Sequence, residues 1–348
     1  MSQARLTIDL DALARNFHTI AGWAKGAEVA PVLKADAYGL GVAPVAQRLA
    51  HEGARSFYVA RLSEGEALRA ALGPGPAVLV LDGLTPGDGD RMAAAGLTPV
   101  LLSAQQVERA RGWKGPAVLH VDTGMNRSGL ALDELADLRL AGLDVRGLLS
   151  HLGSAHDPAD PRNTLQLQRL QAAKARFPNL PVSLAASAGS ALGEAFRFNQ
   201  VRPGVSLFGG GPEERPEARL EAVATLTAPV INVRDVAAGE LMGYGSHRRA
   251  ERPMRLAIVA AGYADGIIRR SGGVGQAWLA GAMRPVALVN MDLIAIEIGD
   301  AAVSEGHEAE LLGPHVLLDD LAAWAGTVAH EILVRLSPRA ERVYLGAV

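Results

Sequence analysis

The chain has 348 residues, a formal net charge of −3 and no cysteine. This length favours two domains, and the shares of apolar residues (49%) and charged residues (20%) are typical of a globular protein. The near-neutral charge, without a basic stripe, argues against a nucleic-acid partner, and the lack of cysteine excludes disulfides and thiolate metal sites. No apolar run reaches the ~18 residues that cross a bilayer, and no signal peptide is evident, so we expect a cytoplasmic protein with no membrane partner.

The first two thirds of the chain alternate between strand and helix patterns. Residues 5–10 predict a strand, and Asp11 is expected to cap a helix that carries Leu13, Phe17 and Ile20 at helical spacing. The strands expected after it are residues 28–34, 56–60, 77–81, 98–102, 117–121, 145–150, 182–186 and 201–207. The helices expected between them are residues 43–52, 63–72, 88–95, 104–111, 132–141, 162–176 and 190–195. Apolar strands separated by helices predict an α/β fold, and eight repeats match a closed (β/α)8 TIM barrel better than an open sheet.

The pattern changes near Arg219, after which short strands and turn residues predominate. The strands expected there are residues 223–230, 256–260, 284–289, 293–298 and 309–312, with one helix at 318–325. We therefore predict a mostly β C-terminal domain of residues 223–348, joined by residues 1–8, after a barrel domain of residues 9–222.

Lys34 ends the first barrel strand and begins the segment KADAYGLG of residues 34–41. Catalytic groups of such barrels lie at the carboxyl ends of the strands. Because a buried ammonium group is costly, a lysine at this place suits a Schiff base, although position alone is also consistent with a lysine that simply enters a loop.

Polar residues also follow later strands. The segment HVDTGMNRSG of residues 120–129 ends the fifth strand, and Arg127 in it suits a carboxylate or phenolate ligand. Serines and glycines at 187–190 and 202–205 follow the seventh and eighth strands, where barrels commonly bind phosphate. His156, Asp157 and Asp160 lie among prolines and indicate a solvated loop, so we expect no metal site.

The segments 34–41, DTGMNR at 122–127 and RPG at 202–204 resemble, in order, the signature segments of the alanine racemase family. GYG at 243–245, GYADG at 262–266 and NMD at 290–292 resemble motifs of that family's β domain. The resemblance spans the whole chain. It implies the cofactor pyridoxal 5′-phosphate and a homodimer in which each active site combines one subunit's barrel with the other's β domain.

The resemblance also implies a role for each matching residue. Lys34 would hold the cofactor, and Lys34 and Tyr244 would be the two acid/base groups on opposite faces of the substrate Cα, as racemisation requires. The implied cofactor contacts are Lys34, Tyr38, His151, Ser187, Arg202, Gly204 and Val205. The implied substrate contacts are Arg127, Tyr263 and Met291.

Four positions depart from the family pattern. His120 stands where a lysine, often carbamylated, braces the arginine, and Ala186 stands where an asparagine precedes the phosphate-binding serine. Ser183 replaces a histidine, and Val334 replaces a tyrosine near the phosphate. Arg127 must therefore be oriented differently here.

The implied function is interconversion of L- and D-alanine, which supplies D-alanine for peptidoglycan. The alternatives are a racemase for another or broader set of amino acids, a related barrel decarboxylase and a noncatalytic pyridoxal-phosphate carrier. Tyr244 and Met291 disfavour the decarboxylase, and the β domain disfavours the carrier.

Overall fold

The computed structural model describes residues 3–138, 140–244 and 248–347. Gly245, the last residue of the GYG motif, lies outside the described residues. The chain forms two compact units. One comprises residues 13–207 with 211–213, and the other residues 3–12, 208–210 and 214–347.

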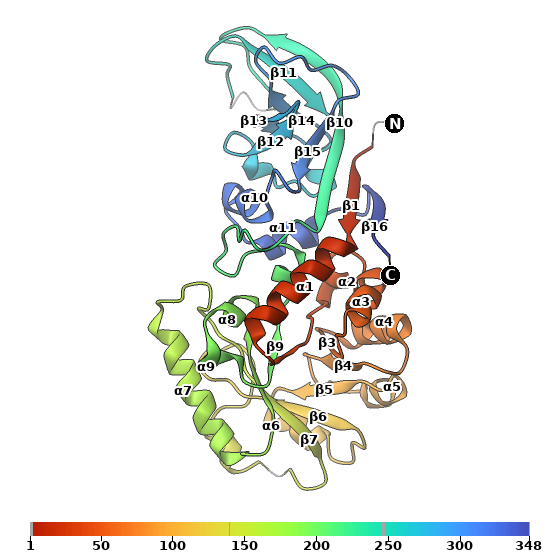
Figure 1. The fold of residues 1–348 in the computed structure, drawn as a ribbon, viewed down its shortest axis with the longest axis vertical. Coiled ribbons are helices and arrows are strands. Elements are labelled where there is room, and N and C mark those ends of the chain that lie inside the picture. Colours follow the sequence, from red (N-terminus) through yellow and green to blue (C-terminus); the bar gives the residue numbers. More distant parts are fainter. Residues whose placement is uncertain (1–2, 139, 245–247, 348) are drawn as a thin grey trace. The chain divides into compact units, whose positions relative to one another are not determined.

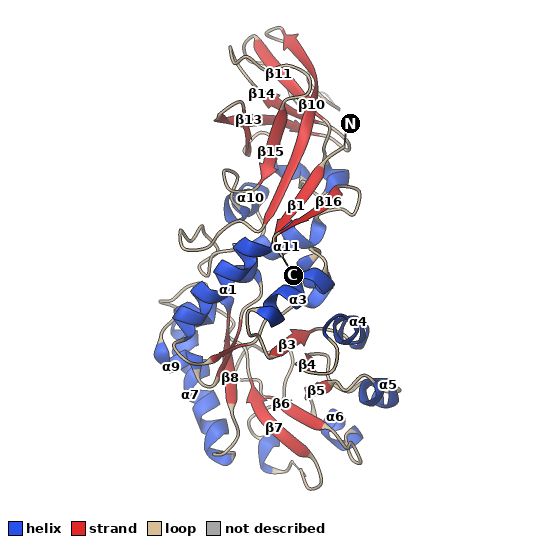
Figure 2. Ribbon diagram, turned by 45° about the vertical axis from the view of Figure 1, so that its right-hand side comes forward, coloured by secondary structure: helices blue, strands red, loops and turns tan. Residues whose placement is uncertain are grey.

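The unit of residues 13–207 is a parallel barrel, with its strands surrounded by helices (Figure 2). In the described part of the chain its strands lie in the order β2, β9, β8, β7, β6, β5, β4, β3. Their bounds are Glu28–Val29 for β2, Ser56–Val59 for β3, Ala77–Val80 for β4, Thr98–Leu101 for β5, Pro116–His120 for β6, Asp144–Leu149 for β7, Val182–Ala186 for β8 and Gln200–Arg202 for β9. Val32 bridges Tyr58 in parallel and links the first strand segment to β3. The predicted TIM barrel is confirmed, with the strand expected over 28–34 reduced to β2 and this bridge.

The barrel interior is packed by side chains from neighbouring strands. The cluster contains Ala30, Val32, Tyr58, Leu79, Val100, Val118 and Leu149, all buried. Alternation along each strand places these side chains inside, while the intervening side chains contact the helices. The interior is therefore a core, and the strand ends are where a site can open.

Helices cover the outside of the barrel (Figure 1). Their bounds are Lys34–Tyr38 for α2, Val42–His51 for α3, Leu62–Leu72 for α4, Gly89–Ala94 for α5, Ala104–Arg109 for α6, Pro161–Arg176 for α7, Ser187–Ala191 for α8 and Glu194–Arg197 for α9, and short 3-10 turns span Glu134–Ala136 (η1) and Val205–Phe208 (η2). The helix predicted over 132–141 is wrong, because only η1 forms among its described residues. The carboxylates of Asp133 and Glu134 there accept hydrogen bonds from nearby backbone N–H groups, which compete with a helix.

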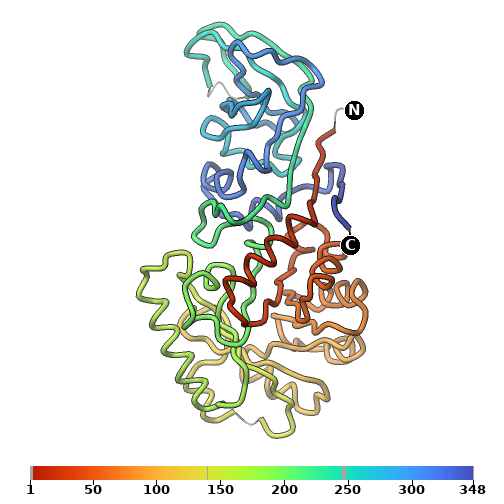
Figure 3. The backbone as a smooth tube through the Cα atoms, viewed as in Figure 1, coloured from red at the N-terminus to blue at the C-terminus, as the bar shows by residue number. Residues whose placement is uncertain are grey.

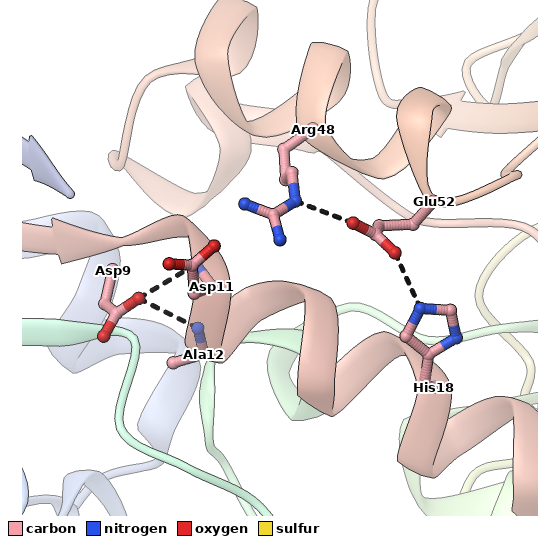
Figure 4. Close-up of polar contacts among 6 residues, drawn as sticks. All are labelled: Asp9, Asp11, Ala12, His18, Arg48 and Glu52. Atoms are coloured by element: carbon pink, nitrogen blue, oxygen red, sulfur yellow. Dashed lines mark hydrogen bonds and ion pairs between the residues drawn. The ribbon is translucent and has the colours of Figure 1, made fainter. Parts of the chain in front are cut away.

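Helix α1 (Leu10–Ala24) is capped by Asp9, not by Asp11 as the sequence suggested. The Asp9 carboxylate accepts hydrogen bonds from the backbone N–H groups of Asp11 and Ala12, both at 2.9 Å (Figure 4). An N-cap side chain bonds to the N–H groups two and three residues ahead, and this geometry makes Asp9 the cap. Further along α1, His18 contacts the Glu52 carboxylate at 2.7 Å, and Arg48 of α3 donates to the same carboxylate at 2.8 Å.

The second unit is mostly β, as predicted. Its strands are Arg5–Asp9 for β1, Ala224–Val236 for β10, Met254–Val259 for β11, Gln276–Leu279 for β12, Ala282–Val289 for β13, Ile294–Glu297 for β14, Glu308–Leu312 for β15 and Glu341–Leu345 for β16. Strands β10, β11, β14, β13, β12 and β15 pair in that order, and β15 pairs back with β10, so they form a small closed barrel. Two helices, α10 (Leu318–Ala325) and α11 (Ala329–Arg335), complete the unit, together with the 3-10 turns Tyr263–Asp265 (η3) and Arg269–Ser271 (η4).

Strand β1 joins this unit from the start of the chain. It pairs antiparallel with β10 and parallel with β16, and Figure 3 shows the two ends of the chain running side by side here. The sequence did not indicate β12, β16 or α11. Among the described residues, no helix is both long and apolar enough to cross a membrane.

Candidate active site

Lys34 lies where the first barrel strand ends, at the start of an unusual turn. The next four residues, Ala35 to Tyr38, are all left-handed, with φ between 52° and 57°. Each L-residue in this conformation costs about 1–2 kcal/mol, so the surrounding contacts must hold the turn in place. Burial and the nearby Arg127 guanidinium lower the pKa of Lys34, while the Glu64 carboxylate opposes that shift. A lowered pKa increases the uncharged, nucleophilic fraction of this amine.

Tyr38 and the backbone around Gly204 form a tight cradle. A Cβ atom on Gly204 would lie only 2.1 Å from the Tyr38 hydroxyl oxygen, so no larger residue fits there without movement. The Ser187 hydroxyl accepts hydrogen bonds from the backbone N–H groups of Gly204, at 3.0 Å, and Ser206, at 3.3 Å. Tyr38, Ser187 and Gly204, predicted from separate segments, are brought together here, and buried Val205 lies between the two N–H donors.

Ser206 belongs to the same cradle and was not predicted from the sequence. Its side-chain oxygen is buried and has no hydrogen-bond partner among the described residues. A buried hydroxyl without a partner is uncommon and indicates a site for an absent polar group. Ser206 sits within an apolar run, and that position gave no signal in the sequence.

Arg202 is buried between neighbouring strands and held by neutral groups. It donates to the backbone oxygen of Ser150 at 2.6 Å and to the Ser183 hydroxyl, and its guanidinium lies 5.8 Å from the centre of the Tyr58 ring. No ion pair to Arg202 occurs among the residues that the structure describes. Burial lowers the pKa of Arg202 to about 10, which still leaves it cationic near neutrality. Ser183, which departs from the family pattern, thus acts as one brace of this arginine.

Two histidines beside Arg202 are neutral. Burial, then Arg202 and Arg127, lower the pKa of His120 to about 4 and that of His151 to about 3. His120 therefore cannot replace the anionic carbamate expected at its position. Arg127 acts electrostatically on Lys34, His120 and His151, which places it at the same rim as Lys34.

Helix α7 holds two loops of this rim through one buried side chain that the sequence analysis did not single out. The Gln166 side-chain oxygen accepts from the Gly153 N–H at 2.8 Å, and its nitrogen donates to the His151 carbonyl at 2.9 Å and to the Thr123 hydroxyl at 3.2 Å. Gln166 thereby links the loop that carries His151 to the loop that leads to Arg127. A glutamine within a polar helix gives no sequence signal for this role.

The other residues predicted for the site lie in the second unit. Tyr244, Tyr263 and Met291 are exposed there, with 79%, 46% and 54% of their surface accessible. The structure brings Tyr263 and Met291 together: the Tyr263 N–H donates to the Asn290 carbonyl and the Ala264 N–H to the Met291 carbonyl, each at 2.9 Å. Val334, another departure, is an exposed residue of α11 in this unit.

The loop of residues 156–160 binds its own backbone. The Asp160 carboxylate caps α7 by accepting from the Arg162 N–H at 2.8 Å, and Asp157 accepts from the Ala159 N–H at 3.0 Å. Within residues 3–138, 140–244 and 248–347, no group of three or more metal-ligating side chains gathers.

Known proteins resemble this chain over nearly its whole length. Residues 8–212 match the family described as alanine racemase, N-terminal domain, and residues 223–344 match alanine racemase, C-terminal domain. A protein named alanine racemase from Methylobacterium sp. (strain 4-46) is 43% identical over 98% of both chains, and one from Acidiphilium cryptum is 42% identical over 99% of both. A crystal structure of alanine racemase from Bartonella henselae with covalently bound pyridoxal phosphate is 33% identical and superposes with a TM-score of 0.92 over 99% of this chain and 100% of that one. The chain therefore belongs to the alanine racemase family.

Proposed function

We propose that this protein is an alanine racemase that interconverts L- and D-alanine with pyridoxal 5′-phosphate as cofactor. The observation that carries the proposal is Lys34, an amine of lowered pKa that shares the rim of a TIM barrel with a cationic arginine and two neutral histidines. The family membership of both parts of the chain supports the amino-acid substrate. The match of residues 223–344 argues against a carrier made of the barrel alone.

The residues of the barrel fit pyridoxal phosphate. The cradle of Tyr38, Ser187, Gly204 and Val205 would hold the phosphate, because hydroxyl groups gather there and the buried Ser206 side-chain oxygen has no partner among the described residues. Lys34 would bind the aldehyde carbon, His151 would pack beside the ring and Arg202 would face the ring nitrogen. A buried arginine keeps its proton and does not pass it to the ring.

The two proton transfers fall to two side chains. The bound cofactor withdraws electrons from the substrate Cα and makes its proton acidic. Lys34 Nζ removes or returns that proton on one face, and its lowered pKa increases the uncharged fraction that can accept a proton. Tyr244 Oη acts on the opposite face. Arg127 and the Met291 backbone N–H would bind the substrate carboxylate, and Tyr263 would narrow the entrance.

We further propose a homodimer in which Tyr244, Tyr263 and Met291 come from the partner subunit. All three are exposed on the β unit of a single chain, and a second copy would cover them. In this proposal the functional domains are residues 9–222 for the barrel and 223–348 with 1–8 for the β domain. The enzyme would act in the cytoplasm and supply D-alanine for peptidoglycan.

The direct test is formation of D-alanine from L-alanine by the purified protein with added pyridoxal phosphate. Lys34→Ala should abolish this activity, because it removes both the Schiff-base amine and one proton carrier. D-alanine formation can be followed with a D-amino-acid oxidase assay. If the wild-type protein binds the cofactor but turns over a different amino acid, the cofactor assignment stands and the alanine assignment fails.

A further inference from the structure

Glu64 joins the turn that carries Lys34 to the loop that follows β3. It is a half-buried residue in the first turn of α4. One carboxylate oxygen accepts a hydrogen bond from the Ala35 N–H at 2.8 Å. The other accepts from the N–H groups of Ala60, at 2.8 Å, and Arg61, at 3.1 Å.

Part of this arrangement is ordinary helix capping. A glutamate at the third helical position commonly accepts from the N–H of the cap residue, here Arg61. The bond to Ala35 is different, because Ala35 is 29 residues away and directly follows Lys34. Ala35 is also the first left-handed residue of the turn. The carboxylate thus fixes the peptide group that connects Lys34 to that turn.

Neutral hydrogen bonds also support the turn: at the lysine end, the Ala37 N–H donates to the Leu33 carbonyl at 3.0 Å, across Lys34. The N–H groups of Gly39 and Gly41 donate to the carbonyls of Ala35 and Asp36, and the Asp36 carboxylate accepts from the Val42 N–H at 2.7 Å. These bonds hold the far end of the turn, towards α3. At the lysine end, the bond that the Ala35 N–H donates to the Glu64 carboxylate is the stronger one, since charged acceptors form hydrogen bonds roughly twice as strong as neutral ones.

We propose that Glu64 is a positioning residue of the racemase site: it holds the left-handed turn in register and so aims the Lys34 amine. This inference rests on the proposed function of Lys34. The charged or titratable groups that act on Lys34 are Glu64, Arg127 and His151. Among the described residues that act on Lys34, Glu64 supplies the negative charge, and it opposes the lowering of the Lys34 pKa.

The test compares Glu64→Gln with Glu66→Gln in the holoenzyme. Glu66 is a matched control, because it is half-buried on the same helix and its carboxylate pairs with Arg91 at the surface. The visible absorbance of the imine between Lys34 and pyridoxal phosphate is titrated with pH, and kcat and KM for L-alanine are measured. We expect Glu64→Gln to lower the pKa of the imine by about one unit, since an opposite charge stabilises its protonated form, and to lower kcat about tenfold. Glu66→Gln should leave both quantities at wild-type values.

A third variant separates the effect of the Glu64 charge from the effect of its side-chain length. Glu64→Asp keeps the charge but shortens the side chain, so it should keep the imine pKa near the wild-type value and still lower kcat. If Glu64 only caps α4, the Glu64 variants will lower the thermal unfolding temperature while kcat and the imine pKa match Glu66→Gln, and the proposal is then wrong. Should Glu64→Gln fail to fold, an unchanged kcat in Glu64→Asp overturns it equally. A wild-type protein without a visible imine would instead refute the proposed function.

Discussion

His120, at the carboxyl end of β6, shows how one departure from the family pattern affects the dependence of stability on pH. The side chain is buried, and its pKa is lowered from 6.5 to about 4 by burial and by the charges of Arg202 and Arg127. The folded protein therefore keeps this imidazole neutral at pH 5, whereas the unfolded chain protonates it. Stability contributed by this group is present above about pH 6.5 and is lost as the pH falls towards 4.

We expect the wild-type protein to lose about 2 kcal/mol of unfolding free energy between pH 8 and pH 5 on account of His120. His120→Asn should remove this part of the loss, because asparagine does not titrate. Urea unfolding of both proteins at the two pH values measures the difference directly. An equal loss in both proteins would show that His120 does not govern the pH response.

The sequence identified those site residues that lie at the end of a strand or soon after it. Lys34, Tyr38, Ser187 and Gly204 each end a strand or follow one, and the barrel brings such strand ends to one rim. Glu64, Gln166 and Ser206 could not be found in this way. Their roles depend on bonds to the backbone of distant segments, and their local patterns are those of a helix cap, a polar helix and a buried run.

Helix α7 is the element that holds the rim loops in place. Gln166 is fully buried and satisfies polar groups of the two loops that contain His151 and Thr123. Arg162 and Arg169, on the same helix, donate to the carbonyls of Gly124 and Thr123. Through these hydrogen bonds, the helix that packs against the barrel also fixes the positions of the rim loops.

Gln166→Leu keeps a similar volume but leaves the Gly153 N–H and the His151 carbonyl without this partner. We expect a loss of about 2–3 kcal/mol in unfolding free energy, together with weaker cofactor retention, because His151 would no longer be fixed. Chemical unfolding and dialysis followed by absorbance measure the two effects. Gln168→Leu, an exposed position on the same helix, is the control. Equal behaviour of the two variants would contradict the role of Gln166.

The barrel was predictable from the sequence because buried parallel strands form unbroken apolar runs. The elements that were predicted wrongly or missed have physical explanations. The segment at 132–141 has a helical pattern, yet of its described residues only Leu135 is buried, so too little packing supports a helix. Strands β12 and β16 were missed because they are short and carry charged or exposed residues that weaken their alternation.

The proposed dimer makes a quantitative prediction. Lys34→Ala and Tyr244→Phe would each inactivate the homodimer. In a mixed dimer, however, the intact Lys34 of one subunit would meet the intact Tyr244 of the other. Random exchange of equal amounts should therefore restore about a quarter of wild-type activity, since half of the dimers have one complete site of two.

The measurement is racemase activity after the two variants are unfolded and refolded together, with each refolded alone as the control. Sedimentation reports the oligomeric state in parallel. Activity no greater than that of the separate variants would show that each chain builds its own site. A fully active monomer would exclude the shared-site arrangement altogether.

The pairing of β1 affects how the chain can fold during its synthesis. Arg5–Asp9 is made long before its partners, because β10 and β16 begin at Ala224 and Glu341. The strands of the parallel barrel are all complete by Arg202, so that unit can form on the ribosome while β1 still lacks a neighbour. The closure of such a long loop makes this pairing slow. Strand β1, made before its partners, is therefore among the last strands to pair.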